Sequence, residues 1–177
     1  SSPDFESGPP DIKAIELARA VVDRGLRESG AIDFGSLCIR KGEKAWVLVI
    51  DVYSINDEGN LADAMGLCAL AALMDAKFPK YDEKSNKIIY EERTNKGVNL
   101  KEQPIPITVV KIKEKLLVDP NLDEENCVSS RLTVTTLEDG SICALQKGGA
   151  GPLDGNEIGK MVEIAVKKGK ELRKLLK

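Results

Sequence analysis

The spacing of apolar residues predicts a first helix over residues 11–28. Asp11 is a suitable N-cap, because its carboxylate can accept hydrogen bonds from the first backbone N–H groups of a helix. Gly30 is a suitable stop signal. The expected buried stripe recurs at helical intervals and consists of Ile15, Ala18, Val22 and Leu26. This helix is therefore expected to pack one face against the rest of the protein.

Two further helices are predicted from the apolar pattern of residues 61–76 and 156–177. The first of these runs is apolar on nearly all sides, which is typical of a helix sandwiched between layers. It is shorter than the ~20 residues that a membrane-spanning helix needs. The last helix is lysine-rich near its C-terminus, as the helix dipole favours. Its expected buried residues are Ile158, Val162, Ala165 and Leu172.

Alternating residue types predict strands in the first half of the chain. Residues 36–40 and 44–55 have the pattern of two strands joined by a hairpin turn at residues 41–43. The second strand is apolar on both faces as far as Asp51, which is typical of a central strand covered on both sides. A lysine-rich segment farther along contains one further short strand, at residues 87–92.

The sequence pattern of the second half of the chain predicts hairpins. An Asp139-Gly140 pair is a strong hairpin signal. The expected strands are residues 107–113, 116–119, 131–137 and 141–146. Helices and hairpins in this order predict an α+β fold of layered mixed sheets with covering helices. We expect two parts, residues 1–103 and residues 104–177.

Composition narrows the class of protein. The 177 residues are 42% hydrophobic and 31% charged, which fits a folded globular protein. The net charge of −3 argues against coating of nucleic acid over the whole surface, so any such contact must be a local patch. The chain contains no histidine, the commonest general base and zinc ligand. Any catalysis would therefore rest on carboxylates, lysine, tyrosine or cysteine.

The cysteines predict a reducing compartment. No C-x-x-C pair occurs, and the scattered positions are Cys38, Cys68, Cys127 and Cys143. Such thiols are expected to be reduced and mostly packed as small hydrophobes, in a cytoplasmic protein. The first residues are polar and proline-rich, so we expect no signal peptide. Cys38 and Cys68 lack a histidine partner, and we expect no nucleophile among them.

Three arginines on the first helix are the leading candidates for ligand contact. They are Arg19, Arg24 and Arg27. Guanidinium groups suit phosphate better than ammonium groups do, so these residues indicate contact with an anionic polymer. The alternative is a surface ion-pair ladder, because Arg19, Asp23 and Arg27 are successive i,i+4 neighbours. Residue patterns alone favour the ion-pair ladder, because runs of charged residues are usually solvated helix faces.

Two other segments are weaker candidates for a catalytic or binding site. The acidic run at residues 119–125 could bind magnesium or exchange protons, but a solvated acidic loop is the favoured interpretation. Gly148-Gly149-Ala150-Gly151 lacks the fingerprint of a phosphate-binding loop and indicates a flexible hinge. We expect no metal and no cofactor.

Several short segments resemble one known family. They are F-E-S-G-P-P-D at 5–11, A-I-E-L-A-R at 14–19, V-V-D-R at 21–24, D-V-Y at 51–53, G-N-L-A-D-A at 59–64 and L-V-D-P at 117–120. Together they resemble the RNase PH-like, non-catalytic ring subunits of the archaeal exosome, over essentially the whole chain. The resemblance implies the RNase PH fold, related to the second domain of ribosomal protein S5. It also implies a catalytic RNase PH-like partner subunit.

The resemblance also implies that this chain has no catalytic residues. Active relatives carry a phosphate-binding turn with a hydroxyl and an arginine, and here that place is Gly59-Asn60-Leu61-Ala62. Active relatives carry two acids after a strand. The corresponding positions in this sequence are Glu125 and Arg131. A cation at the second position is incompatible with acid catalysis.

RNA contact is what the resemblance implies instead. The residues carried over are Arg24, Arg27 and Arg19, which would bind the RNA backbone beside the catalytic partner. Ala20 is an extra residue between the first two arginines, so either a π-bulge restores the helical register or Arg19 points elsewhere. The family's chains begin with a region of strands that this sequence lacks. We therefore expect the first sheet to expose an edge.

The resemblance therefore predicts a non-catalytic, RNA-binding subunit of a phosphorolytic 3′–5′ exoribonuclease complex. By resemblance, its partners are the catalytic subunit in a hexameric ring of three heterodimers, the RNA-binding cap subunits and single-stranded RNA, without a membrane. One alternative is a self-sufficient enzyme of the RNase PH type that uses Asp119, Asp123 or Glu125 with magnesium. Another alternative is a pure scaffold with no RNA contact.

Overall fold

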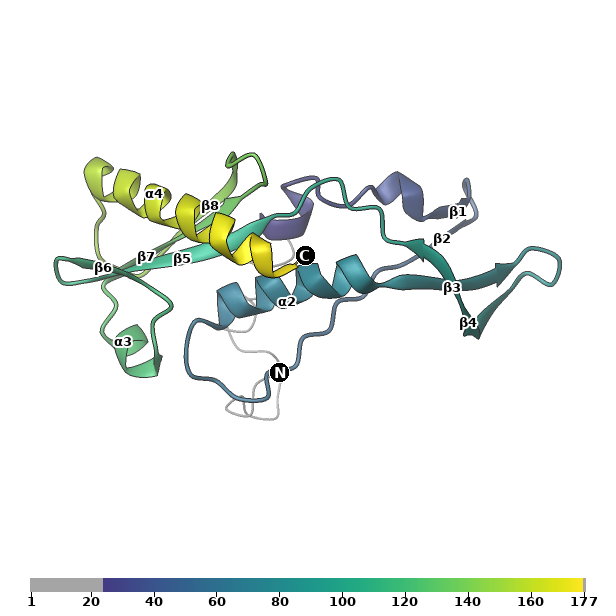
Figure 1. The fold of residues 1–177 in the computed structure, drawn as a ribbon, viewed down its shortest axis with the longest axis horizontal. Helices are drawn as coiled ribbons and strands as arrows, with labels where there is room; N and C mark the ends of the chain where they lie inside the picture. Colours follow the sequence, from purple (N-terminus) through teal and green to yellow (C-terminus); the bar gives the residue numbers. More distant parts are fainter. Residues whose placement is uncertain (1–23, 177) are drawn as a thin grey trace.

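The computed structural model describes residues 24–176, which form an elongated molecule (Figure 1). A four-stranded sheet lies at one end, and helix α2 (Leu61–Asp75) lies in the middle. Two β-hairpins lie at the other end. Among the described residues, no helix is long and apolar enough to cross a membrane. The sequence boundary expected between residues 103 and 104 stays a prediction.

The four-stranded sheet is antiparallel and has the order β6-β5-β7-β8. Its strands are β5 (Ile105–Ile112), β6 (Lys115–Val118), β7 (Ser130–Thr136) and β8 (Ile142–Gly148). Both hairpins predicted from the sequence are confirmed. The turn between β7 and β8 contains Gly140 at a φ of 86°, a conformation that glycine adopts without steric cost.

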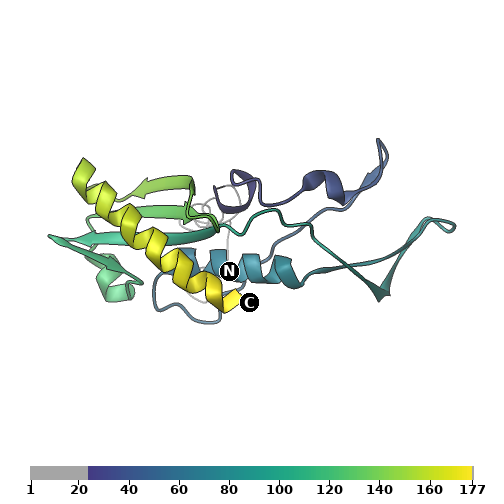
Figure 2. The same cartoon turned by 45° about the horizontal axis from the view of Figure 1, so that its top comes forward.

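Helix α4 (Gly155–Leu172) crosses a face of this sheet (Figure 2). Asp154 and Glu157 form a reciprocal capping box at its start. The residues buried toward the sheet are Met161, Ala165 and Gly169. The predicted stripe is partly wrong, because Ile158 is 38% exposed whereas Met161 is fully buried. The one-turn helix η3 (Arg173–Leu176) follows, and the Arg173 guanidinium donates to the carbonyls of Gln103 and Thr136.

Helix α2 lies against the start of β5, where the pairing of β6 has ended. β6 pairs only with Val109–Ile112, and Gly66 of α2 lies against the ring of Pro106. The buried face of α2 includes Gly66, Ala69, Leu70 and Leu73, and its exposed residues include Ala64, Cys68, Ala71 and Ala72. The prediction of a helix covered on nearly all sides is therefore wrong within the described chain. The prediction of mostly packed cysteines is also wrong, since the exposed thiols are Cys38, Cys68 and Cys127.

The first predicted hairpin is confirmed, but its second strand is much shorter than expected. Strands β1 (Cys38–Arg40) and β2 (Lys44–Ala45) pair around the predicted turn. Residues 46–55 belong to no strand. Leu48 and Ile50 pack on a small core cluster, while the alternate side chains Val47, Val49, Tyr53 and Ile55 are 75–92% exposed. A covered central strand is therefore not formed within the described residues, because a strand exists only where a neighbour supplies a ladder.

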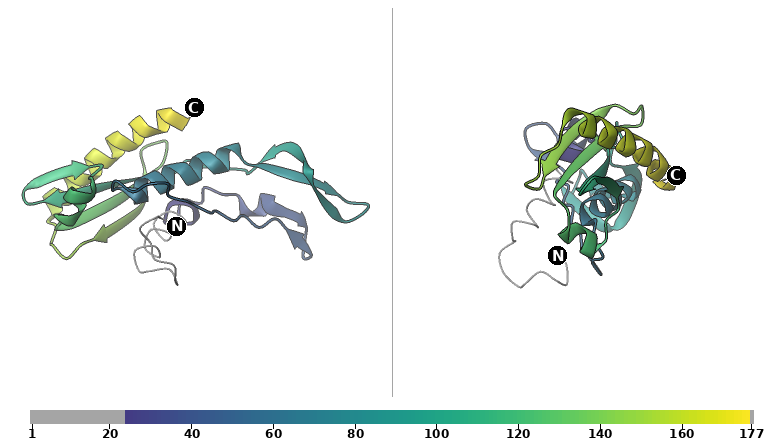
Figure 3. Two further views of the ribbon diagram at one scale, coloured as in Figure 1. Left: turned by 90° about the horizontal axis from the view of Figure 1, so that it is seen from below. Right: turned by 90° about the vertical axis from the view of Figure 1, so that its left-hand side faces the viewer.

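A long hairpin, β3 (Lys77–Asp82) and β4 (Lys87–Gly97), projects from the body at the same end as β1 and β2 (Figure 3). The predicted strand at residues 87–92 is confirmed and extends to Gly97, but β3 was not predicted. The pairing register shifts between Lys77 and Pro79 and again between Pro79 and Lys80. Such irregularities twist a hairpin locally.

The glycine run after β8 is a packed segment rather than the predicted hinge. A Cβ at Gly149, which has a φ of 79°, would lie 2.7 Å from the carbonyl oxygen of Ser129. A Cβ at Gly151 would lie 2.8 Å from the same oxygen, to which Gly151 donates its N–H. The glycines are thus required by the close approach of two backbones.

Candidate nucleic-acid interface

Arg24 and Arg27 lie on one irregular helical turn. Residues 24–27 are π-helical, and both arginines are exposed, whereas Gly25 and Leu26 between them are buried. Leu26 packs with Ala31, Ile32 and Leu73. The turn is therefore anchored on α2 and leaves both arginines on the surface. Gly30 follows with a φ of 67° and donates its N–H to the carbonyl of Arg27, as predicted for a helix stop.

The ionic contact of Arg24 is loose. Its Nε lies 4.0 Å from Oε1 of Glu28, and both side chains are nearly half exposed. Exposed i,i+4 pairs of this kind contribute only about 0.3–0.5 kcal/mol. A phosphate group can offer two oxygens to the guanidinium fork, so it can compete with Glu28 for Arg24.

The π-helical turn is relevant to the prediction made from the extra residue between Arg19 and Arg24. A π turn is one of the two outcomes that the extra residue predicts, and it occurs at residues 24–27. Arg19, Ala20 and Asp23 lie outside the described residues. The direction of Arg19 and the expected ion-pair ladder therefore stay predictions.

Asn60 is a junction between the start of α2 and the segment after β6. It has a left-handed φ of 52°. Its backbone N–H donates to Glu125 Oε1 at 2.8 Å, and its side-chain amide donates to Asp119 Oδ1 at 3.1 Å. The N–H of the preceding Gly59 donates to Asp57 Oδ1 at 2.9 Å. Carboxylates of the chain itself therefore accept the backbone N–H groups that lead into α2.

This arrangement opposes the binding of inorganic phosphate at residues 59–62. A helix N-terminus attracts an anion because its first N–H groups have no partner within the helix. Here two N–H groups beside that end already donate to carboxylates. A phosphate would have to displace those carboxylates while three nearby acids, Asp57, Asp119 and Glu125, repelled it. The expected lack of a phosphate-binding turn stays a prediction.

Asp63 is the strongly perturbed acid in this region. Burial raises its pKa to about 6, although hydrogen bonds from Thr108 and Asn60 act in the opposite direction. Both of its oxygens accept hydrogen bonds from Thr108, at 2.7 Å from the backbone N–H and at 2.7 Å from the hydroxyl. The Thr108 hydroxyl also lies 2.9 Å from that of Thr133. Asp63 therefore ties α2 to the sheet.

The structure brings together two of the three acids proposed for a self-sufficient enzyme. Asp119 and Glu125 meet at Asn60, whereas Asp123 is exposed on the short helix α3 (Leu122–Asn126). Arg131 lies elsewhere, with its guanidinium against Gly148, where a Cβ would approach Nε to 2.6 Å. Residues 24–176 contain no cluster of three or more acidic, cysteine or histidine side chains suited to a metal ion.

Sequence reasoning missed Asn60 as the organising residue. Its partners lie 65 and 59 residues farther along the chain, so no local pattern connects them. The available signals were a Gly59-Asn60 turn directly before an apolar helix and an acidic run with no sequence motif. Either signal alone is common on solvated surfaces.

Two models of one family match most of the chain. Residues 1–79 match the first domain of the 3′ exoribonuclease family, and residues 102–168 match its second domain. The order of the two matches is the order of the domains in the family.

Curated relatives match over nearly all of this chain. The chain is 48% identical to the exosome complex component Rrp42 of Thermococcus gammatolerans, over 99% of this chain and 64% of the relative. It is 45% identical to the Rrp42 component of Methanosarcina acetivorans, over 99% of this chain and 63% of the relative. The chain thus spans somewhat less than two thirds of the length of the relatives it matches.

Solved structures match the fold equally well. One is described as an Archaeoglobus fulgidus exosome with RNA bound to the active site, with a TM-score of 0.86 and 38% identity over all of this chain and 66% of that chain. Another is an archaeal exosome core, with a TM-score of 0.82 and 35% identity over 94% of this chain and 64% of that chain. The predicted RNase PH-like fold is confirmed by these matches. On domain content, identity and fold, this chain belongs to the 3′ exoribonuclease family.

Proposed function

We propose that this chain is a structural and RNA-binding subunit of an exosome, a phosphorolytic 3′–5′ exoribonuclease complex, and that it is not an enzyme by itself. The observation that carries the proposal is the start of α2, where Asp57 and Glu125 accept the backbone N–H groups of Gly59 and Asn60. Carboxylates at this position repel the phosphate that phosphorolysis consumes. Similarity to Rrp42 components of archaeal exosomes supports the assignment.

RNA contact is assigned to Arg24 and Arg27. Both are exposed on a turn that Leu26 anchors in a small core cluster. The planar fork of a guanidinium is preorganised, so less conformational entropy is lost for each hydrogen bond that it forms with a phosphate. Contacts to phosphate position a strand without reading its sequence. The chain would therefore hold RNA of any sequence for a neighbouring catalytic subunit.

Division of labour follows from this assignment. The partner, a catalytic RNase PH-like subunit, would bind inorganic phosphate and supply the catalytic acid, and this chain would complete the shared RNA path. We propose three such pairs in a hexameric ring that also binds RNA-binding cap subunits. The match to a solved exosome with RNA bound to its active site supports this arrangement.

A second candidate function is a self-sufficient enzyme, and the meeting of Asp119 and Glu125 at Asn60 favours it. A Glu125→Gln variant distinguishes the two functions, because glutamine keeps an oxygen that can accept the Asn60 N–H but removes the negative charge. The proposal expects unchanged RNA degradation by the assembled complex. Loss of activity in this variant would favour the self-sufficient enzyme.

Phosphorolysis of a single-stranded RNA tests the proposal directly. The chain is assayed alone, the catalytic partner alone, and both together, with inorganic phosphate as the second substrate. We expect no nucleoside diphosphate from this chain alone and efficient release from the mixture. Robust activity without the partner would overturn the proposal.

A further inference from the structure

A cleft of about 540 Å³ separates the β1–β2 hairpin from the β3–β4 hairpin. Both hairpins lie at the end of the molecule away from the four-stranded sheet (Figures 1 and 3). The volume of the cleft is within the range of about 300–1,000 Å³ that ligand sites span. We call it the hairpin cleft. Its lining includes Trp46, Tyr81, Tyr90, Lys44, Lys87 and Asn86.

Three aromatic residues, Trp46, Tyr81 and Tyr90, are among the residues that line the hairpin cleft. Trp46 stacks on Phe78 of β3, with ring centroids 5.3 Å apart and an interplanar angle of 24°. Tyr90 of β4 is 72% exposed. An exposed aromatic ring on a strand is costly to hydrate and is suited to stacking with another flat group. The cleft therefore offers both a fixed ring system and an accessible ring.

Hydrogen bonds to one asparagine hold a cation and a tyrosine in the lining of the cleft. Asn86, in the β3–β4 turn with a φ of 58°, accepts hydrogen bonds from the Tyr81 hydroxyl and from the Lys44 ammonium group. The Lys44 Nζ lies 5.7 Å from the centre of the Tyr81 ring. Two strands of different hairpins are thereby joined, and a positive charge is held beside an aromatic face.

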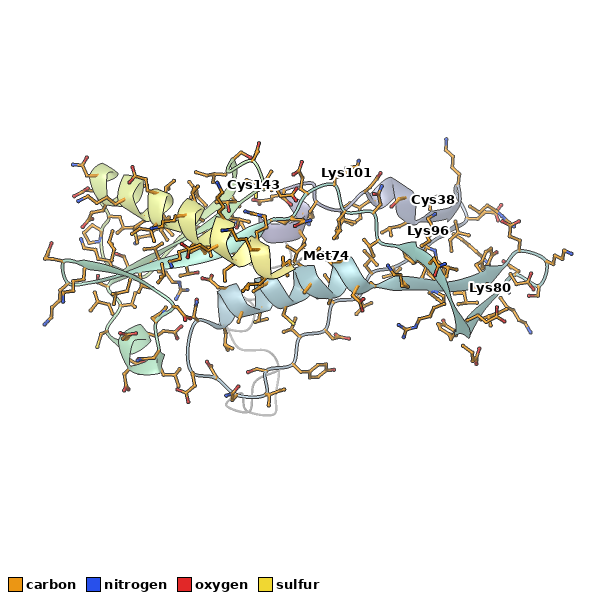
Figure 4. The ribbon with its side chains drawn as sticks, in the orientation of Figure 1. Cys38, Met74, Lys80, Lys96, Lys101 and Cys143 are labelled. Atoms are coloured by element: carbon orange, nitrogen blue, oxygen red, sulfur yellow. The ribbon has the colours of Figure 1, made fainter. Side chains whose placement is uncertain are left out.

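Charge distinguishes this end of the molecule from the rest. Residues 38–45 and 77–97 contain nine lysines and arginines and five acidic residues, a net charge of +4, while the whole chain has a net charge of −3. Lys80 and Lys96, labelled in Figure 4, lie on the same projecting hairpin. A local positive field in an acidic protein attracts a polyanion. Aromatic rings with interleaved cations are the chemistry by which proteins hold single-stranded nucleic acid.

We propose that the hairpin cleft is a second contact for single-stranded RNA, with bases stacked on Tyr90 and phosphates paired with Lys87 and Lys44. This inference rests on the proposed RNA-binding function and adds a separate contact to Arg24 and Arg27. The net positive charge favours RNA over a protein partner as the occupant. A protein partner is an outcome of the test.

The test measures affinity of the assembled complex for an unstructured oligouridine by fluorescence anisotropy. Because a stacked base is lost, the Tyr90→Ala complex should bind the RNA at least about fivefold more weakly. The Tyr90→Phe complex keeps the ring and should bind the RNA normally. Tyr53→Ala is the matched control, because Tyr53 is 75% exposed and lies outside the cleft lining. Lys87→Glu should reduce the salt dependence of binding, and Lys160→Glu on the exposed face of α4 should not.

Photo-crosslinking of 4-thiouridine RNA adds a positional readout. We expect a crosslinked peptide that contains Tyr90 and loses its RNA in Tyr90→Ala. One outcome separates the two proposals. If Tyr90→Ala binds RNA normally while an Arg24→Glu, Arg27→Glu variant binds it weakly, the proposed RNA contact in the hairpin cleft is wrong and the proposed function stands. Loss of complex assembly in Tyr90→Ala, seen by native mass spectrometry, would also overturn the proposed RNA contact in the cleft, because the surface would then hold a protein. Normal binding by both variants would overturn both proposals.

Discussion

The carboxylate of Asp63 takes the place of a missing strand partner for Thr108. Thr108 immediately precedes Val109, where the pairing of β6 with β5 ends. The Asp63 oxygens accept its N–H and its hydroxyl, each at 2.7 Å. A backbone donor left unpaired in this buried place would cost about 1–3 kcal/mol. Asp63 therefore belongs to the fold, although its raised pKa resembles that of a catalytic acid.

Stability should depend on pH through Asp63. Its pKa is about 6 in the folded protein against 3.8 for the ordinary side chain, so the folded state binds this proton more tightly. The contribution of Asp63 to the free energy of unfolding should fall by about 3 kcal/mol as pH rises from 3.8 to about 6, then stay constant. Urea unfolding of the wild type and Asp63→Asn across this range measures the difference. Parallel profiles for the two proteins would contradict this account.

Removing the Glu125 carboxylate should destabilise the junction at Asn60. Glu125→Ala leaves the Asn60 N–H, now 2.8 Å from Oε1, without its acceptor. We expect a loss of about 1–2 kcal/mol in the free energy of unfolding. Glu125→Gln should lose less, because its amide oxygen can accept the same hydrogen bond. Asp123→Ala, on the exposed surface of α3, is the control and should change stability by no more than ~0.5 kcal/mol.

The glycine run can be tested by a pair of glycine-to-alanine substitutions. Gly149→Ala would bring a Cβ within 2.8 Å of two backbone atoms of residues 129 and 130, at a φ of 79°. We expect a loss of about 1–3 kcal/mol of stability. Gly159→Ala, inside α4 with no atom within 4 Å of the new Cβ, should instead stabilise by ~0.5–1 kcal/mol. Equal effects at the two positions would show that the glycine run is a loose hinge.

Local patterns were sufficient to predict most of the sheet and two helices. The hairpin at Asp139-Gly140 follows from turn chemistry, and Gly140 has the φ of 86° that such a turn requires. Helix α2 begins at the predicted Leu61. Residues 46–55 and β3 were not predicted correctly, because strand formation depends on a neighbour that the local sequence does not specify. The shared hydrogen bonds of Asn86 across two hairpins were hidden for the same reason.

The candidate site was likewise predictable only in part. Arg24 and Arg27 were assigned to RNA contact through resemblance to a known family, and they stay predictions as RNA contacts. The closure of residues 59–62 by Asp57 and Glu125 emerged only from the fold, because Glu125 lies 65 residues from Asn60 in sequence. The acidic run looked like a solvated loop, yet Glu125 and Asp119 are both hydrogen-bonded within the protein.

The most direct test of the central claim is the salt dependence of RNA binding by the assembled complex. An Arg24→Glu, Arg27→Glu variant is compared with the wild type, and Lys160→Glu on α4 serves as the charge-reversal control. Native mass spectrometry first establishes that each variant assembles with the catalytic partner. If the two arginines hold RNA phosphates, the variant binds more weakly, and its slope of log affinity against log salt shrinks by roughly 0.7 for each lost contact. Unchanged affinity and slope in an intact ring would contradict the account and identify the chain as a scaffold.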